Sequence, residues 1–376
     1  MKNKEEKSAA AGFDALQLAR PAVQRASAYH TPREDLNGPT DYTLLDVNES
    51  PVSPFRWGRE DQLHRYPDSR QRALRSALAK HFSLQPGQVF TGNGSDEVFD
   101  LLIRAFAQPH EDALLISPPT FGMYAHYAQL QDVHVTEVPL TPAFDLDKPA
   151  LEAALQQAGT EGKPKLKLWA VGSPNNPTGN RPNDRLLEAL IPRFPGLVIV
   201  DEAYGDFSEA ASWATRLGEF PNLVVLRTFS KAWGLAGIRV GAALAHPSVV
   251  RVLGRVKAPF NLNQLSIAAA IRALQQPATL QHHTRLLVSY RQELARELEK
   301  FAFVERVFPS EANFLLVRVT EPKAIFRHLL KAGVLVRDRS GLPGCAGCLR
   351  INAGLPEENR QLLDTLATYQ PEAGTP

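Results

Sequence analysis

The feature that most constrains the fold is a regular alternation of short apolar runs with amphipathic segments in the first two thirds of the chain. The expected strands lie at residues 112–116, 166–171, 196–200 and 223–227, and the expected helices at residues 69–82, 95–107 and 182–193. Parallel strands need a long crossover between them, and that crossover is usually a helix. This order therefore predicts an α/β fold whose mostly parallel sheet is covered by helices on both faces.

The pattern changes after Pro259, where two long helical stretches precede several short strands. The expected helices lie at residues 263–275, 278–300, 321–332 and 355–368, and the strands at residues 303–307, 312–318, 334–337 and 348–352. This succession is typical of a smaller α+β domain. We divide the chain into a large domain at residues 51–260, a small domain at residues 261–376, and a segment at residues 1–50 that packs on the small domain or on a partner subunit.

Charge and hydropathy narrow the classes of partner. The 376 residues carry 42 basic and 40 acidic side chains, spread along the chain, and no basic stripe indicates binding to nucleic acid or to an anionic membrane. The charged start of the chain lacks the apolar core of a signal peptide, and no later run is long and apolar enough to span a bilayer. We expect a cytoplasmic protein that acts on small molecules.

Metal chemistry is not expected. Cys345 and Cys348 are the two cysteines, and their Cys-x-x-Cys spacing is used in metal and redox sites. A tetrahedral zinc site needs two more ligands, and no His pair lies nearby in the sequence. We interpret the two thiols as structural, and we interpret His282 and His283 as part of a solvated helix face.

The strongest chemical indication is Lys231. It lies in the segment Thr-Phe-Ser-Lys-Ala-Trp-Gly at residues 228–234, directly after the expected strand at 223–227, and Arg239 follows eight positions later. A lysine is ordinarily solvent-exposed, so its surroundings must decide its role. Hydroxyls, small residues and a nearby arginine are what an enzyme needs to hold an aldehyde cofactor through a lysine.

Three further segments lie where expected strands end. Residues 91–97 begin a helix whose free N–H groups attract phosphate, and residues 173–179 form a proline-rich turn at the carboxyl edge of the sheet. Asp201 ends the buried run at 197–200, where a carboxylate can hold a pyridine nitrogen protonated. The first two segments are also common as helix starts and connecting turns. Together and in this order, they point to one cofactor.

These motifs resemble those of the fold-type I pyridoxal-phosphate aminotransferases. The resemblance rests on Asn-Asn-Pro-Thr-Gly at 175–179, Asp-Glu-Ala-Tyr at 201–204, and Ser-Lys with Gly-x-Arg-x-Gly at 230–241. It implies pyridoxal 5'-phosphate as cofactor and a large domain with a seven-stranded sheet. Lys231 would hold the cofactor covalently and carry the proton, Asp201 would pair with the ring nitrogen, Asn176 and Tyr204 would bind the ring oxygen, and Phe121 would stack on the ring.

The same resemblance implies a set of groups for the cofactor phosphate. They are the backbone amides of Ser95 and Asp96, the side chains of Thr228 and Ser230, and the guanidinium group of Arg239.

Several segments are similar to the histidinol-phosphate aminotransferases in particular, over residues 12 to 369. They lie at 46–51, 65–68, 118–124, 256–261, 312–315 and 334–351. Membership would imply amino transfer between histidinol phosphate and 2-oxoglutarate, with imidazole acetol phosphate and glutamate as products, in histidine biosynthesis. Histidinol phosphate carries a phosphate where other substrates carry a carboxylate, and Arg337 and Arg350 are the candidates that bind it, since guanidinium groups can fork to either anion.

The resemblance also assigns residues near the substrate. Tyr29, Asn48 and Tyr124 would contact the substrate, although the residues around Tyr29 depart from the Pro-Tyr pattern of the family. Tyr66 would reach the cofactor phosphate of a neighbouring subunit, so a homodimer is expected.

Other activities remain open at this point, because fold-type I enzymes also include decarboxylases and lyases. A phosphothreonine-type decarboxylase or an aromatic amino-acid aminotransferase would share the cofactor motifs and the arginines. A cofactor-binding regulator without catalysis would usually add a DNA-binding module, and residues 1–50 show neither a helix-turn-helix pattern nor a basic patch.

Overall fold

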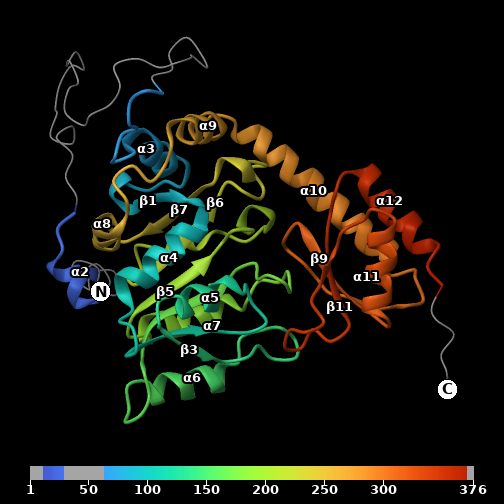
Figure 1. The fold of residues 1–376 in the computed structure, drawn as a ribbon, viewed down its shortest axis with the longest axis horizontal. Coiled ribbons are helices and arrows are strands. Elements are labelled where there is room, and N and C mark those ends of the chain that lie inside the picture. Colours follow the sequence, from blue (N-terminus) through green and yellow to red (C-terminus); the bar gives the residue numbers. More distant parts are fainter. Residues whose placement is uncertain (1–11, 29–62, 371–376) are drawn as a thin grey trace, which may run out of the picture.

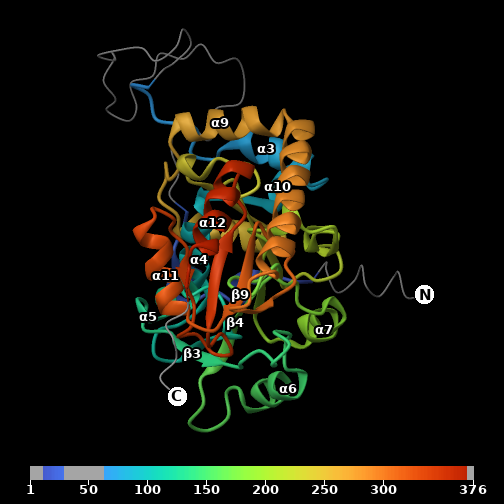
Figure 2. The same ribbon diagram turned by 90° about the vertical axis from the view of Figure 1, so that its right-hand side faces the viewer.

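The computed structural model describes residues 12–28 and 63–370, which form two units, each built on its own β-sheet. Figure 1 shows the two units next to each other, with the long helix α10 (Pro277–Leu298) running from the larger unit into the smaller one. The 90° turn in Figure 2 shows β9 and the helices of the smaller unit in front of the larger sheet.

The larger unit contains a seven-stranded sheet with the strand order β1-β7-β6-β5-β4-β2-β3. Its strands are β1 (Val89–Asn93), β2 (Asp112–Ile116), β3 (His134–Glu137), β4 (Lys165–Gly172), β5 (Leu197–Asp201), β6 (Leu223–Thr228) and β7 (Val240–Ala245). β7 runs antiparallel to both of its neighbours, and the pairs from β6 to β3 are all parallel. The expected mostly parallel, seven-stranded sheet is confirmed.

Helices cover both faces of this sheet, because its central strands carry apolar side chains on both faces. In β5, Leu197 and Ile199 point into one buried cluster and Val198 and Val200 into the other. The first cluster includes residues of α4 (Gly94–Phe106), α5 (Met123–Gln129) and α8 (Pro247–Val256), and the second includes residues of α3 (Arg72–His81), α6 (Lys148–Gln157), α7 (Asp184–Leu190) and α9 (Gln264–Leu274). The sheet is therefore buried on both sides, and its strand ends are left for ligands.

The described part of the amino-terminal segment lies on the larger unit. Its elements are the 3-10 turn η1 (Ala15–Gln17) and the short helix α2 (Pro21–Arg25). Ala15, Ala19 and Val23 are four residues apart, so one apolar face of this segment enters the same cluster as α4 and α8. Residues 12–28 therefore pack on the larger unit and not on the small domain, packing on a partner subunit stays a prediction, and residues 29–50 lie outside the described part.

The expected boundary after residue 260 also differs from the packing. Ala270 of α9 is buried in the cluster that contains α3, and Ile267 and Leu274 pack against that cluster. The apolar face of α9 thus completes the larger unit, and the chain passes to the smaller unit only along α10.

The smaller unit holds a four-stranded antiparallel sheet in the order β10-β11-β9-β8. Its other elements are β8 (Val304–Val307), β9 (Phe314–Val319), α11 (Pro322–Lys331), β10 (Arg337–Asp338), β11 (Cys348–Asn352) and α12 (Pro356–Ala367). Leu349 and Ile351 of β11 pack with buried residues of α10, α11 and α12. Side chains alternate along a strand, so Cys348, Arg350 and Asn352 lie on the opposite face of the sheet.

Within residues 12–28 and 63–370, no helix is both long enough and apolar enough to cross a lipid bilayer.

Candidate active site

The candidate site lies where the parallel strands of the large sheet end. The carboxyl ends of β4, β5 and β6 lead into the segments that begin at Ser173, Glu202 and Phe229. One cavity at this edge is lined by Ser95, Asp96, Phe121, Tyr124, Gly172, Pro174, Asn176, Asp201, Ala203, Tyr204, Thr228, Ser230, Lys231 and Arg239. Open α/β sheets bind their ligands at this edge, and every residue that the resemblance assigns to the cofactor of this chain's own site lines the cavity.

One corner of the cavity gathers donors suited to a phosphate group. The Nη1 atom of Arg239 donates to the Ser230 hydroxyl at 3.2 Å, and the Ser230 and Thr228 hydroxyls lie 3.1 Å apart. Nη2 of Arg239 lies 3.2 Å from the Asp96 carboxylate, at the first turn of α4. The amino end of this 13-residue helix adds partial positive charge there.

Two glycines allow these groups to come close. Gly94 has φ +76°, and a Cβ there would lie 2.5 Å from Nη2 of Arg239. A Cβ on Gly241 would lie 2.2 Å from the backbone nitrogen of Ser95. The Gly-x-Arg-x-Gly motif and the Gly94 turn are therefore parts of one packed corner, in which no larger side chain fits.

Asp201 is buried at the end of β5, and two donors hold it in place. The Tyr124 hydroxyl donates to Oδ2 at 2.7 Å, and the backbone N–H of Ala203 donates to Oδ1 at 3.0 Å. Burial raises the pKa of this carboxyl, and these two hydrogen bonds oppose the rise. A cationic ring nitrogen beside Asp201 would favour the ionised form further.

Asn176 and Tyr204 also line the cavity. The Asn176 side-chain oxygen accepts a hydrogen bond from Nη1 of Arg350 at 2.5 Å, which leaves the amide nitrogen of Asn176 as a donor. The buried ring of Tyr204 packs edge-on against Phe314 at 5.1 Å. Arg350 lies over the same Phe314 ring, 5.3 Å from its centre. The small sheet thus delivers a guanidinium group directly to the edge of the cavity.

Lys231 is solvent-exposed, and its Nζ atom lies 5.5 Å from the centre of the Tyr204 ring. The pKa of Lys231 is lowered, first by its partial removal from bulk water within the cavity and then by the positive charge of Arg350. A lowered pKa increases the fraction of neutral amine, which is the form that attacks an aldehyde or accepts a proton.

A second cavity adjoins the first and is rich in arginine. Phe121, Asn176, Tyr204 and Lys231 line both cavities. The second cavity is also lined by Arg337, Arg339 and Arg350 of the small sheet, along with residues of β11 and α12 that include Glu358. The carboxylate of Glu358 accepts a hydrogen bond from the backbone N–H of Leu355 at 2.7 Å. Lys231 therefore lies between a phosphate-binding corner and a cationic pocket.

The residues present fit pyridoxal phosphate. Hydroxyls and a guanidinium group suit its phosphate, Asp201 suits its ring nitrogen, and the amide of Asn176 and the Tyr204 hydroxyl suit its ring oxygen. Phe121 borders the same cavity and meets Tyr124 edge-on at 5.5 Å.

Comparison with known proteins shows the family. The family described as aminotransferase class I and II matches residues 43–366. The chain belongs to this family. The aminotransferase is 40% identical over 357 residues to a histidinol-phosphate aminotransferase of Cytophaga hutchinsonii, and the match covers 95% of this chain and 99% of the relative.

Solved structures support the same assignment. The aminotransferase resembles the histidinol-phosphate aminotransferase of Sinorhizobium meliloti in complex with pyridoxal-5'-phosphate, with TM-score 0.73 and 26% identity over 80% of this chain and 82% of that one. It also has the fold of an L-threonine-O-3-phosphate decarboxylase from Porphyromonas gingivalis, with TM-score 0.69 and 24% identity over 81% of this chain and 90% of that one.

 At this identity the second likeness shows the fold alone, so the fold of the aminotransferase does not distinguish transamination from decarboxylation.

Most of the residues expected from the sequence meet at this one place, and Tyr124 is among them. Its side chain is buried, and its hydroxyl is bonded to Asp201, so it lies on the cofactor side of the site and not in the arginine pocket. Arg337 lines the second cavity as expected. Tyr29 and Asn48 lie outside the described residues. Tyr66 is half exposed, stacks on Phe260 at 4.4 Å, and lines neither cavity of its own chain.

Sequence reasoning missed Arg339. It follows Arg337 by two positions, and residues two apart in an extended strand share a face. That spacing is the signal that could have found it.

The two cysteines line neither cavity. Cys345 and Cys348 are buried thiols in a small apolar cluster with Phe144, Phe308 and Leu316. In the part of the chain that the structure describes, no group of three or more His, Cys, Asp or Glu side chains is arranged to hold a metal ion.

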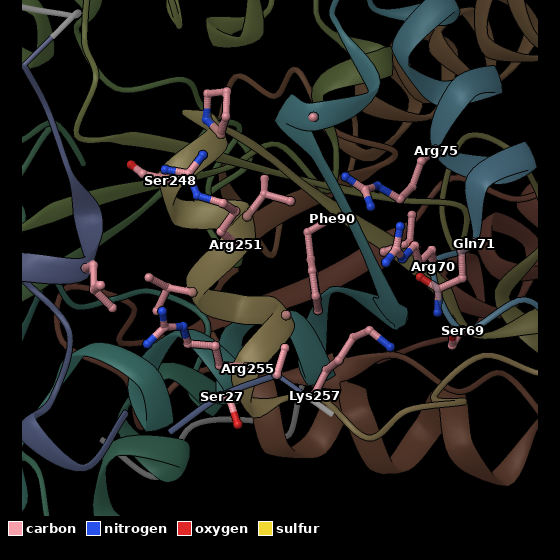
Figure 3. A pocket seen from close by; sticks show the side chains of 18 of the residues that line it. Ser27, Ser69, Arg70, Gln71, Arg75, Phe90, Ser248, Arg251, Arg255 and Lys257 are labelled. Atoms are coloured by element: carbon pink, nitrogen blue, oxygen red, sulfur yellow. Dashed lines mark hydrogen bonds between the residues drawn. The ribbon is translucent and has the colours of Figure 1, made fainter. Parts of the chain in front are cut away.

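A larger cavity lies elsewhere, beside α8 and β1. Figure 3 shows Arg251 and Arg255 on α8 and Arg70 and Arg75 near α3 around it. It also borders Ala28, after which residues 29–62 are not described. None of the described site residues lines it, so we assign it no part in the chemistry.

Proposed function

We propose that this chain is a pyridoxal-phosphate-dependent histidinol-phosphate aminotransferase. It would transfer an amino group between L-histidinol phosphate and 2-oxoglutarate, giving imidazole acetol phosphate and L-glutamate, in histidine biosynthesis. The relatives at 35–40% identity that carry this name support the proposal. We also propose a cytoplasmic location, which fractionation of cells that express the chain would test.

The observation that carries the proposal is the junction of the two cavities at Lys231. A substrate whose amino-bearing carbon lies near Lys231 can extend its anionic end toward Arg337 and Arg350. Guanidinium groups bind carboxylate and phosphate with the same fork geometry. One pocket can therefore take histidinol phosphate in one half-reaction and glutamate in the other.

The cofactor, when bound, supplies an aldehyde that takes up the amino group and a ring that accepts electrons from the substrate carbon. Lys231 would hold it covalently, and its Nζ atom would then take a proton from that carbon and pass it to the cofactor. Asp201 would keep the ring nitrogen protonated through its carboxylate. The amide nitrogen of Asn176 and the hydroxyl of Tyr204 would donate to the ring oxygen.

The remaining residues hold the cofactor in place and orient the substrate. Arg239, Ser230 and Thr228 hold the cofactor phosphate in the corner beneath α4. Phe121 packs on the ring face and helps to keep water away from the reacting carbon. Arg350 orients the substrate and, through its bond to Asn176, links substrate binding to the cofactor side of the site.

Glutamate should convert the purified enzyme from the aldehyde form of the cofactor to its amine form in a single turnover, because the proposed cycle is ping-pong. The absorbance of the cofactor reports this change. Imidazole acetol phosphate should then restore the aldehyde form, and L-histidinol phosphate should drive the reverse change. Failure of both amino donors to change the absorbance would contradict transamination.

The same experiment separates the alternative activities. A phosphothreonine-type decarboxylase would release carbon dioxide from O-phosphothreonine, and an aromatic aminotransferase would use phenylalanine at a kcat/KM similar to that for histidinol phosphate. We expect no carbon dioxide release and a clear preference for histidinol phosphate, because the arginine pocket suits a dianion better than an aromatic ring.

We further propose that the enzyme is a homodimer in which Tyr66 completes the site of the partner subunit. Its partial exposure and its position outside both cavities of its own chain support this. A phenol hydroxyl on a short segment next to Pro67 could donate to a phosphate of a second copy.

Mixing two inactive variants tests this arrangement. Tyr66→Ala and Lys231→Ala chains should each be weakly active alone, and refolded mixtures should recover activity, because a hybrid dimer holds one site with both residues intact. Light scattering should give a mass of two chains for each protein. Recovery would not occur if Tyr66 served its own subunit, since neither hybrid site would then be complete.

A further inference from the structure

We propose that Arg339 is a third cationic residue of the substrate pocket, and that it sets the preference for a phosphate over a carboxylate. This inference rests on the proposed function, because it names the part of the pocket that would bind the substrate phosphate. Arg337 and Arg350 suffice for a monoanion, and Arg339 supplies the further fork that a dianion can use.

The strand register places the three arginines on one face of the small sheet. Arg337 of β10 lies directly opposite Arg350 of β11, and directly opposed residues in an antiparallel pair point the same way. The backbone N–H of Arg339 donates to the carbonyl of Cys348 at 2.8 Å, so the pairing of the two chains continues through Arg339. All three side chains line the arginine cavity next to Lys231.

The guanidinium group of Arg339 has hydrogen-bonding capacity to spare. Its Nε atom is buried and has no hydrogen-bond partner among the described residues, and the same is true of Nε of Arg350. An orphaned buried donor costs free energy, and such a donor at the wall of a cavity calls for a partner inside it. An anion in the cavity would supply acceptors for both.

The local charges point the same way. The pKa of Arg339 is lowered by burial and then by the positive charges of Arg350 and Arg337, and the pKa of Arg350 is lowered by burial. Positive charges gathered in one pocket repel each other, and an anion bound between them offsets this repulsion. A phosphate has nearly two negative charges and three free oxygens, so it neutralises three arginines and accepts their hydrogen bonds better than a carboxylate with one charge and two oxygens.

The backbone around Arg339 holds it in this position independently of its side chain. The N–H of Leu342 donates to the carbonyl of Arg339 at 3.0 Å, and the N–H of Ser340 donates to the Asp338 carboxylate at 2.8 Å. Replacing the side chain should therefore leave the loop folded, so a loss of function can be attributed to the guanidinium group.

The test compares Arg339→Gln and Arg339→Lys with the loaded wild-type enzyme. For Arg339→Gln we expect the KM for histidinol phosphate to rise about 10- to 100-fold, since charge-assisted hydrogen bonds are lost. The rates with glutamate and with unphosphorylated histidinol should change by less than about 3-fold. Arg339→Lys should recover part of the loss, because it keeps the charge without the fork.

Two binding readouts do not depend on turnover. Calorimetry with inorganic phosphate should show a dissociation constant about 10-fold higher for Arg339→Gln than for the wild type. The kcat/KM for histidinol phosphate should rise with pH as the phosphate loses its second proton near pH 6, and the variant should show a smaller rise. Arg327→Gln is the matched control, since Arg327 is an exposed arginine on α11 of the same unit.

The outcomes separate this inference from the proposed function. An unchanged KM and unchanged phosphate binding in Arg339→Gln would overturn the inference, as would an equal loss with histidinol phosphate, histidinol and glutamate. If the wild type itself does not use histidinol phosphate, the proposed function fails. The comparison of inorganic phosphate binding then still decides whether Arg339 binds a phosphate.

Discussion

Replacing Lys231 with alanine is expected to lower the rate of the glutamate half-reaction by at least about 10³-fold, because the nucleophile and the proton carrier are lost together. The single-turnover absorbance change of the cofactor measures this rate directly. The variant should still bind the cofactor noncovalently, because the phosphate corner of Arg239, Ser230 and Thr228 does not include Lys231.

The fold of this variant should be intact. Lys231 is exposed, and its pKa is lowered, so at neutral pH its ammonium group is held against unfavourable surroundings near Arg350. A folded pKa below the unfolded value means that the charged lysine opposes folding at low pH and that this penalty fades as the pH rises. Alanine removes the penalty, and the unfolding temperature should not fall.

Lys331→Ala provides the matched control, since Lys331 is exposed at the end of α11, away from both cavities. It should leave the rate within about 2-fold of the wild type, as surface substitutions usually do. An unchanged half-reaction in Lys231→Ala would show that another lysine holds the cofactor.

Local patterns in the sequence were sufficient to predict the large sheet and most of the residues on the cofactor side of the site. A run such as Leu-Val-Ile-Val before Asp201 can be read as a buried strand because every side chain is apolar. The order of strands and helices then brings the strand ends to one edge. Asp201, Asn176 and Lys231 could thus be placed together without knowledge of any distance.

The unit against which a helix packs could not be predicted from the sequence in the same way. The apolar faces of α9 and of residues 12–28 are visible in the sequence, but a face does not indicate which surface it will cover. α9 follows the change of pattern at Pro259, yet it packs with α3 of the larger unit. The boundary between units therefore depends on tertiary packing, that is, on which apolar surface each helix covers.

Side-chain direction was the other limit. Tyr124 was assigned to the substrate from its segment, and the structure turns its hydroxyl to Asp201. α5 begins directly before it, at Met123, and the rotation of that helix decides where the ring points. Arg339 was missed because the strand before it has only two residues, so its spacing from Arg337 is a weak signal until the pairing with β11 shows that the segment is extended.

Asp201→Asn is expected to lower transamination by at least about 10²-fold, a loss of the size seen when one preorganised electrostatic contact is removed from a transition state. Asparagine keeps the shape, and its oxygen can still accept from the Ala203 N–H while its amide group donates to the Tyr124 oxygen, but it carries no charge to hold a ring nitrogen protonated. Single-turnover rates with glutamate would measure the loss.

Stability should move in the opposite direction from activity. Burial raises the pKa of Asp201 in the folded chain, so its ionisation at neutral pH opposes folding, and this penalty grows as the pH rises through the folded pKa. The cofactor-free Asp201→Asn protein should therefore be at least as resistant to heat at pH 7 as the wild type. Calorimetry of both proteins without cofactor should show the difference widening as the pH rises from about 4, near the unfolded pKa of a carboxyl, to pH 8.

Asp112→Asn is the control that separates the effect of the position of Asp201 from the effect of burying a carboxylate. Asp112 is also a buried carboxyl with a raised pKa, and its Oδ2 accepts from the backbone N–H of Gln108 at 2.8 Å. It begins β2, however, and Asp201 ends β5, so the two acids lie at opposite edges of the same parallel sheet. Asp112→Asn should leave the rate unchanged. Equal losses in both variants would mean that a buried charge stabilises the sheet as a whole, and the assignment of Asp201 to the ring nitrogen would then fail.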